Sequence, residues 1–197
     1  MPYIDTLTKG SLETEVEIDI IHHFTGNSSS LCDPLLTGNG TNGIGISHYS
    51  AGPNWAIYFG NKGWFNLGRI ISDREYNLKL NKTECSINGS ISSIRAESYS
   101  NNVNIYLGKN AWGEPSSGNS LSYKRVQIKG SRDYVPFICQ ERTADKVSTG
   151  VAQAAGTCGM IDLFTGIFYP NANSSGSFSI AYTLPDGTPW TPLNQTP

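Results

Sequence analysis

The sequence predicts an all-β domain, a β-sandwich or jelly-roll-like fold of about ten short strands. Its 197 residues include 21 Gly, 10 Pro and 10 Tyr, a composition rich in turn formers and poor in helix formers. Apolar and polar residues alternate in several short segments, and turn-forming residues separate these segments. The length fits one large β domain or two small ones.

Residues 14–24 show the clearest alternation. The apolar positions fall on one face of this segment, namely Val16, Ile18 and Ile20. Residues 54–60 alternate in the same way, which predicts that Trp55 points into the core. Further strands are expected at residues 65–71, 75–80, 90–98, 103–108, 121–129, 134–140, 159–169 and 176–184.

Three segments do not have a strand pattern. Residues 31–43 are expected to form a long turn-rich loop, and residues 143–156 are the one stretch that fits a short helix. Residues 185–197 contain four prolines and are interpreted as a Pro-rich linker to a following domain. The β-sandwich is therefore expected to span residues 1–184.

Composition and charge exclude several classes of partner. The net charge is −2 with 14 Lys and Arg residues, so no basic surface for nucleic acid is expected. No apolar run approaches the ~18 residues that a membrane span needs. The N-terminal residues lack the pattern of a signal peptide. We therefore expect neither a nucleic acid nor a membrane as partner.

The cysteines form no CxxC pair, which argues against zinc and redox motifs. Four widely spaced cysteines (Cys32, Cys85, Cys139 and Cys158) in a composition typical of secreted proteins favour two disulfides. Of the three possible connectivities, Cys32–Cys85 with Cys139–Cys158 is favoured because sequential pairs close the shorter loops. The alternative is a set of buried free thiols in a cytosolic protein.

No catalytic or metal-binding motif stands out. His22 and His23 are adjacent on a predicted strand and point to opposite faces, and His48 is expected in a loop, so no metal or other cofactor is predicted. The chain lacks a G-x-S-x-G motif. The carboxylates of Glu97 and Glu114 have no spacing that marks a glycosidase pair. The chain is therefore not expected to be an enzyme.

A lone tryptophan in a polar loop points to recognition instead. Trp112 lies among residues 109–120, KNAWGEPSSGNS, where a flat indole combined with short polar side chains suits the binding of a sugar. The candidate polar partners are Asn110, Glu114, Ser117 and Asn119. In the alternative interpretation, Trp112 folds back and caps one end of the sandwich.

This loop and the C-terminal segment resemble a known family. A loop tryptophan followed by SSGNS (116–120) and LSYKRV is similar to the GlcNAc-binding tip lectins of chaperone–usher fimbriae, and so is PNANSSGSFSIAYTL (170–184). The resemblance implies an elongated immunoglobulin-like or jelly-roll sandwich. It also implies that Trp112 stacks on the ligand, that Ser117 and Asn119 contact it, and that Asn42 lies in a second contact loop.

The expected function is that of a non-catalytic adhesin domain at a fimbrial tip on the bacterial surface. Its expected partners are a host-cell glycan or glycoprotein and, through the linker, a pilin domain and fimbrial subunits, and the isolated domain is expected to be a monomer. Two alternatives remain, a carbohydrate-active hydrolase and a viral receptor-binding spike domain. N-x-S/T sequons favour the viral alternative, at Asn27, Asn39, Asn81, Asn88, Asn173 and Asn194.

Overall fold

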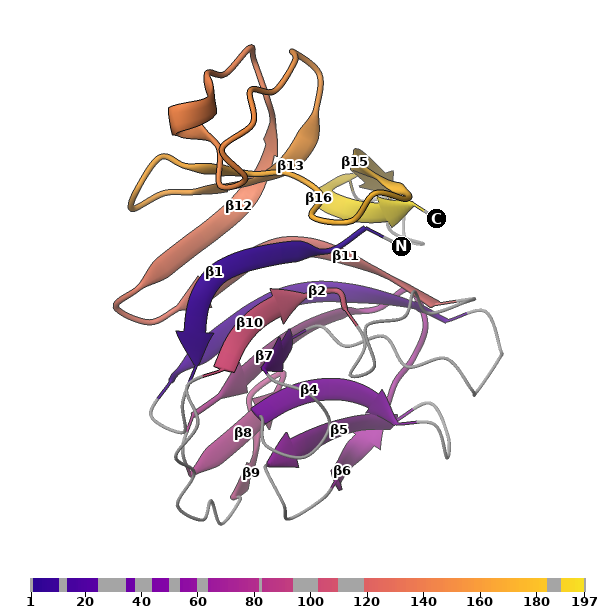
Figure 1. The fold of residues 1–197 in the computed structure, drawn as a ribbon. Helices are drawn as coiled ribbons and strands as arrows, with labels where there is room; N and C mark the ends of the chain where they lie inside the picture. The colour runs from indigo at the N-terminus through magenta and orange to yellow at the C-terminus, as the bar shows by residue number, and fades with distance from the viewer. Residues whose placement is uncertain are drawn as a thin grey trace.

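Two antiparallel β-sheets face each other in the computed structural model (Figure 1). The described residues are 2–10, 14–24, 35–37, 44–49, 54–59, 64–81, 83–93, 103–109, 119–183 and 189–196. The arrangement is that of a β-sandwich, so the predicted all-β class is confirmed. Within the described residues, no helix is long and apolar enough to cross a membrane.

The smaller sheet has six strands. In spatial order they are β1 (Ile4–Gly10), β10 (Val103–Leu107), β3 (Leu35–Thr37), β4 (Ile44–Tyr49), β5 (Asn54–Phe59) and β6 (Trp64–Arg69). His48 belongs to β4, where it pairs with Trp55 of β5. Its expected placement in a loop is therefore wrong.

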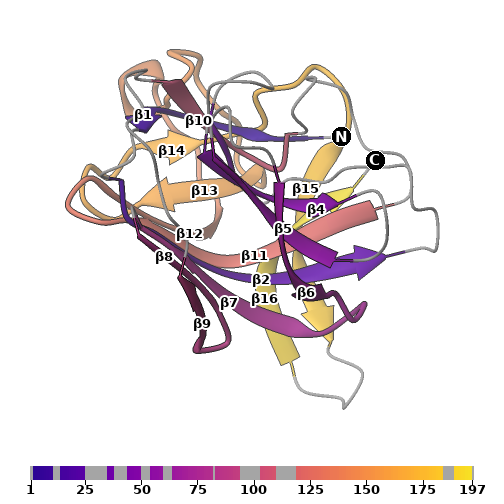
Figure 2. The ribbon, with the colours of Figure 1, turned by 90° about the horizontal axis from the view of Figure 1, so that it is seen from below.

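The larger sheet has β2 near its middle, between β11 and β7 (Figure 2). Its main path is β14 (Phe168–Tyr169), β13 (Cys158–Asp162), β12 (Arg132–Ile138), β11 (Asn119–Ile128), β2 (Val16–Phe24), β7 (Glu75–Leu80), β8 (Glu84–Ile87) and β9 (Ser90–Ser93). The hairpin of β15 (Ser177–Thr183) and β16 (Pro189–Thr196) joins this sheet through pairing of β16 with β11. The strands β12 and β16 thus lie beside successive parts of β11.

The core lies between the two sheets. Ile18 and Ile20 of β2 are fully buried, and Val16 is 3% exposed, which confirms the face predicted from the alternation. Trp55 is also fully buried, and its ring meets Tyr76 edge to face at 5.4 Å between centroids. Burying such side chains stabilises the fold by roughly 1.5–3 kcal/mol each before the entropy cost of ordering them.

Four strands outside the segments with a clear strand pattern account for most of the differences from the expected elements. Strands β1, β3, β4 and β8 were not expected. Asn88 and Gly89 have φ angles of 50° and 79°, which fits a two-residue hairpin turn between β8 and β9. In residues 143–156 the regular helical element is one 3₁₀ turn, η2 (Ala144–Lys146).

The Pro-rich segment forms a strand, so the expectation of a linker without regular structure is wrong for residues 189–196. Pro189 is the first residue of β16, where a missing N–H is tolerated. Between the pairs Ile180↔Leu193 and Tyr182↔Trp190 the register shifts, and Pro192 falls within this irregularity. A following domain stays a prediction.

The two expected disulfides are not formed. Cys85, Cys139 and Cys158 have free thiols, and Cys32 lies outside the described residues. Cys158 pairs across the sheet with Ile138, so Cys139, one residue further along, points to the opposite face. The thiol of Cys139 instead packs beside Val147 and Phe168.

We predict that the unreduced protein contains alkylatable thiols. Burial raises the pKa of Cys85 to about 12 and also raises the pKa of Cys139, so both thiols stay protonated at mildly alkaline pH. Iodoacetamide should label the half-buried Cys158 first in the native protein, and Cys85 and Cys139 after denaturation. Peptide mass spectrometry would contradict this if Cys139 and Cys158 remained unlabelled in denaturant without reductant.

Candidate functional site

Most of the site residues predicted from the sequence lie outside the part of the chain that the structure describes. These residues are Asn42, Asn110, Trp112, Glu114 and Ser117. Glu97, which is considered together with Glu114 as a possible glycosidase carboxylate, also lies outside the described residues. Asn119 is the first residue of β11, and its backbone pairs with Phe24 at the end of β2. This end of the large sheet is called the Asn119 end below.

The two predicted contact loops leave opposite ends of β10. The loop that contains Trp112 follows Leu107, the last residue of this strand. Thr37 pairs with Ile105 and Leu36 with Tyr106, so β3 ends on the side of β10 nearer to Val103. The strands that precede the segments of Trp112 and Asn42 in the sequence therefore end at opposite ends of β10.

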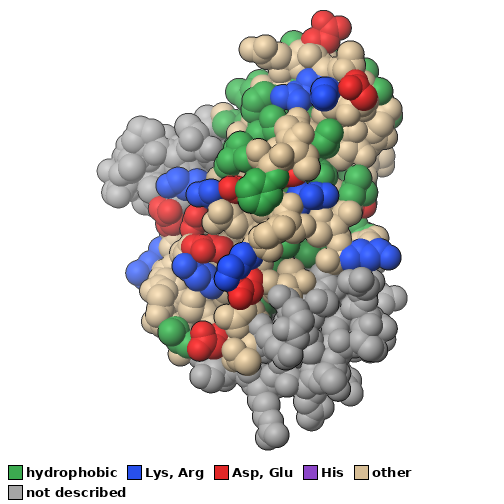
Figure 3. Space-filling view, turned by 90° about the vertical axis from the view of Figure 1, so that its left-hand side faces the viewer, with side chains coloured by type: hydrophobic (Ala, Val, Ile, Leu, Met, Phe, Trp, Pro, Cys, Tyr) green, Lys and Arg blue, Asp and Glu red, His purple; other side chains and the backbone are tan. Residues whose placement is uncertain are grey.

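The outward face of the large sheet carries two neighbouring groups of hydrogen-bonded polar side chains, together called the polar network below. It consists of Glu17, Asp19, Asn77, Lys79, Arg125, Gln127 and Asp133. These residues occupy neighbouring positions on β2, β7, β11 and β12. Figure 3 shows acidic and basic side chains gathered in a mixed group across one face of the molecule.

One half of the polar network is an ion pair with two hydrogen bonds. Arg125 donates from Nε and Nη2 to the two carboxylate oxygens of Asp133, at 2.9 and 2.6 Å. The hydrogen bonds from Arg125 hold the pKa of Asp133 below its usual value. Gln127 donates more weakly to the same carboxylate, at 3.4 Å.

The other half is centred on Asn77. Its amide nitrogen donates to Glu17 at 2.8 Å and to Asp19 at 2.7 Å. Lys79 lies 3.1 Å from the same Oε1 atom of Glu17. Burial raises the pKa of Glu17, but the hydrogen bonds from Asn77 and Lys79 outweigh this effect and bring it below its usual value. Glu17 is therefore an ionised hydrogen-bond acceptor at neutral pH.

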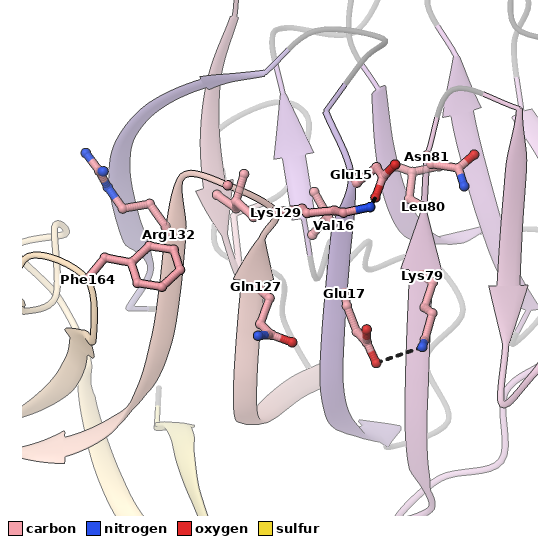
Figure 4. A pocket seen from close by; sticks show the side chains of 12 residues that line it. Glu15, Val16, Glu17, Lys79, Leu80, Asn81, Gln127, Lys129, Arg132 and Phe164 are labelled. Atoms are coloured by element: carbon pink, nitrogen blue, oxygen red, sulfur yellow. Dashed lines mark ion pairs between the residues drawn. The ribbon is translucent and has the colours of Figure 1, made fainter.

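A groove of about 400 Å³ opens at the far end of this face, where β2 begins and β11 ends (Figure 4). It is lined by residues 15–17, 79–81 and 127–130, together with Arg132 and Phe164. Figure 4 shows Phe164 on one side, Gln127 and Glu17 in the middle and Lys79 on the other side. This volume lies within the range of about 300–1,000 Å³ that is typical of small-molecule sites.

The turn between β13 and β14 positions Phe164. The carboxylate of Asp162 accepts hydrogen bonds from the backbone N–H of Phe164 at 3.1 Å and from the hydroxyl of Thr165 at 2.7 Å. Gly166, at a φ of 68°, closes the turn by donating its N–H to the Asp162 carbonyl. The Phe164 side chain stays 63% exposed at the edge of the groove.

A second cluster joins β2, β11 and the turn before β7. His23 Nε2 lies 2.6 Å from Ser122 Oγ, and His23 Nδ1 lies 2.7 Å from Asp73 Oδ1. These distances match those of a Ser-His-Asp triad. Ser122 is fully buried, however, so a substrate cannot reach its hydroxyl in this conformation.

Sequence reasoning missed both the groove and the Ser122 cluster. Their residues come from segments far apart in the chain, and the hydrogen bonds from His23 to Asp73 and Ser122 span 50 and 99 residues. The sequence of residues 162–166, DLFTG, could have indicated part of the groove. An Asp followed by Thr and Gly is typical of a turn, and Phe164 lies within it. Among the described residues, no group of three His, Cys, Asp or Glu side chains could hold a metal ion.

We predict that Asp133→Asn lowers the free energy of unfolding by roughly 2 kcal/mol near neutral pH, because it weakens two charge-assisted hydrogen bonds. The pKa of Asp133 is lowered in the folded state, so its stabilisation is complete above the unfolded-state value of about 4 and is lost as the pH falls. The gap between wild type and variant in urea unfolding should therefore shrink on acidification.

Glu84→Gln is the matched control for this experiment, since Glu84 is an exposed carboxylate on the same sheet. It should change stability by less than about 0.5 kcal/mol. A gap between wild type and Asp133→Asn that stays constant from neutral to strongly acidic pH would contradict the assigned role of Asp133.

Comparisons with known proteins give no family for this chain. No family model matches the sequence, and no curated protein is significantly similar to it.

Proposed function

We propose that this chain is a non-catalytic adhesin domain that binds glycans on host-cell surfaces. The observation that carries the proposal is the polar network, in which carboxylate, amide and guanidinium groups hold one another in position on neighbouring strands. Groups fixed in this way lose little side-chain entropy on binding. Polyhydroxylated ligands are suited to such a surface because each hydroxyl can both donate and accept a hydrogen bond.

The expected biological setting is a fimbrial tip outside the bacterial cell, as the resemblance of residues 116–126 and 170–184 to fimbrial lectins implies. A small sugar on a shallow site gains little binding energy, so single-site affinities of about millimolar to micromolar are expected. Many domains that engage one cell surface would together give strong attachment. A pilin domain and fimbrial subunits remain the proposed partners on the bacterial side.

Hydrolysis is the second candidate function, and one observation favours it. In the cluster of Ser122, His23 and Asp73, Nε2 of the histidine contacts the serine hydroxyl and Nδ1 contacts the aspartate, as in the triad of a serine hydrolase. The full burial of Ser122 argues against it, because an acyl group must approach Oγ closely to be attacked. The same hydrogen bonds give these residues a structural role, since they tie the turn at Asp73 to β2 and β11.

We predict that Trp112→Ala weakens glycan binding at least about tenfold, because a sugar would lose its stacking surface. The melting temperature should change by a few degrees at most, as for a surface substitution. Glycan-array binding and thermal unfolding of the same variant test both expectations, and Trp112→Phe should restore part of the binding. Strong destabilisation with unchanged binding would instead assign Trp112 to the end of the sandwich as a cap.

We predict that a fluorophosphonate probe does not label the native protein, because it cannot reach the buried Ser122 hydroxyl. Intact-mass measurement after incubation tests this, with Ser122→Ala and His23→Ala as comparisons. Labelling of the wild type that disappears in both variants would favour the hydrolase over the adhesin.

A further inference from the structure

We propose that the groove beside Phe164 is a second glycan site, specific for an uncharged sugar, at the end of β11 opposite to Asn119. The groove shares Glu17, Lys79 and Gln127 with the polar network, and the proposal rests on the proposed function for the class of ligand. Three features of the groove identify this ligand: an exposed aromatic ring, hydrogen-bonding groups with unused capacity, and charges that already neutralise one another.

Phe164 supplies the apolar surface. Its ring is 63% exposed although the backbone of its turn is held by hydrogen bonds to Asp162. The C–H face of a pyranose ring packs on such an aromatic ring while the sugar hydroxyls point sideways. In Figure 4 the side chains of Gln127, Glu17 and Lys79 lie to one side of Phe164, where those hydroxyls would be.

The polar groups of the groove keep hydrogen-bonding capacity for a ligand. Within the described part of the chain, both contacts of Glu17 use Oε1, which leaves Oε2 to accept a hydroxyl. Gln127 uses its amide nitrogen for Asp133, and no described residue donates to its side-chain carbonyl oxygen, which can therefore accept from a ligand. The side-chain oxygen Oδ1 of Asn81 accepts hydrogen bonds from the backbone N–H groups of Thr83 and Glu84. The side-chain nitrogen Nδ2 of Asn81 is left as a donor for a ligand.

The charged side chains of the groove disfavour the binding of an anionic sugar. Lys79 lies 3.1 Å from Glu17 and Lys129 lies 2.5 Å from Glu15, so each ammonium group of the groove already has a carboxylate partner. The remaining cation, Arg132, lies 3.6 Å from the fully buried carboxylate of Asp162. An acidic sugar would have to displace one of these carboxylates or approach it, whereas a neutral hydroxyl can bind beside an intact ion pair.

The groove and the Asn119 end of the large sheet are too far apart for one sugar unit. The 10 residues of β11 separate the Asn119 end from the groove, a distance of roughly 30 Å for an extended strand. A sugar unit bound in the groove would therefore not reach Asn119. A domain with two such sites gains avidity on a glycan-covered surface even when each single contact is weak.

The test uses the full chain produced in bacteria, so that the sequon at Asn81 on the edge of the groove stays unmodified. A panel of neutral methyl hexosides and their sialylated or sulfated counterparts is titrated by NMR or calorimetry. We expect Phe164→Ala to weaken the binding of a neutral hexoside to the groove, followed through the NMR signals of the groove residues, at least about tenfold.

Leu163→Ala is the matched control, since Leu163 lies in the same turn, is 55% exposed and does not line the groove. It should leave the affinity within about twofold, and Phe164→Trp should retain binding. Equal melting temperatures for the Phe164→Ala and Leu163→Ala variants establish that both are folded.

The outcomes separate the two proposals. Neutral hexosides that bind and are lost in Trp112→Ala but not in Phe164→Ala would overturn the groove site and keep the proposed function. Preferential binding of sialylated or sulfated sugars through Phe164 would overturn the specificity for uncharged sugars. A wild-type protein that binds no glycan at all would overturn the proposed function and, with it, the groove site.

Discussion

The pairing of β2 with β11 and β7 is the contact on which the rest of the structure depends. One face of β2 buries Val16, Ile18 and Ile20 in the core, and the other presents Glu17 and Asp19 to the polar network. Because side chains alternate strictly along a strand, a shift of one residue would bury the acids and expose the isoleucines. The register of this strand therefore determines the core and the polar surface together.

The architecture could be predicted from the sequence where strands alternate over many residues, as residues 14–24 do. Short strands such as Leu35–Thr37 carry too few residues for a periodic signal, and their formation depends on partners elsewhere in the chain. The strand at residues 189–196 has no clear signal in the sequence, because proline usually disfavours pairing in a sheet. In the sheet, Pro189 and Pro192 occupy positions that tolerate the loss of an N–H donor.

The candidate sites were less predictable than the fold. The groove depends on the register of β2, β7 and β11 and on a turn contributed by β13 and β14, so residues such as Glu17 and Phe164 meet only in the folded chain. The prediction of the two disulfides is wrong for a related reason. Spacing along the chain favoured Cys139–Cys158, whereas the pleat of the sheet places Cys139 on the face opposite to Cys158.

The pairing of β16 with β11 has a mechanical consequence. Tension applied to β16 would act on backbone hydrogen bonds to both β11 and β15, and β11 is a strand whose other edge is bonded to β2. A load along the strand direction would have to shear these bonds together instead of opening them one at a time. The resistance of the domain to pulling would then be set by the rate at which this strand detaches, and not by equilibrium stability.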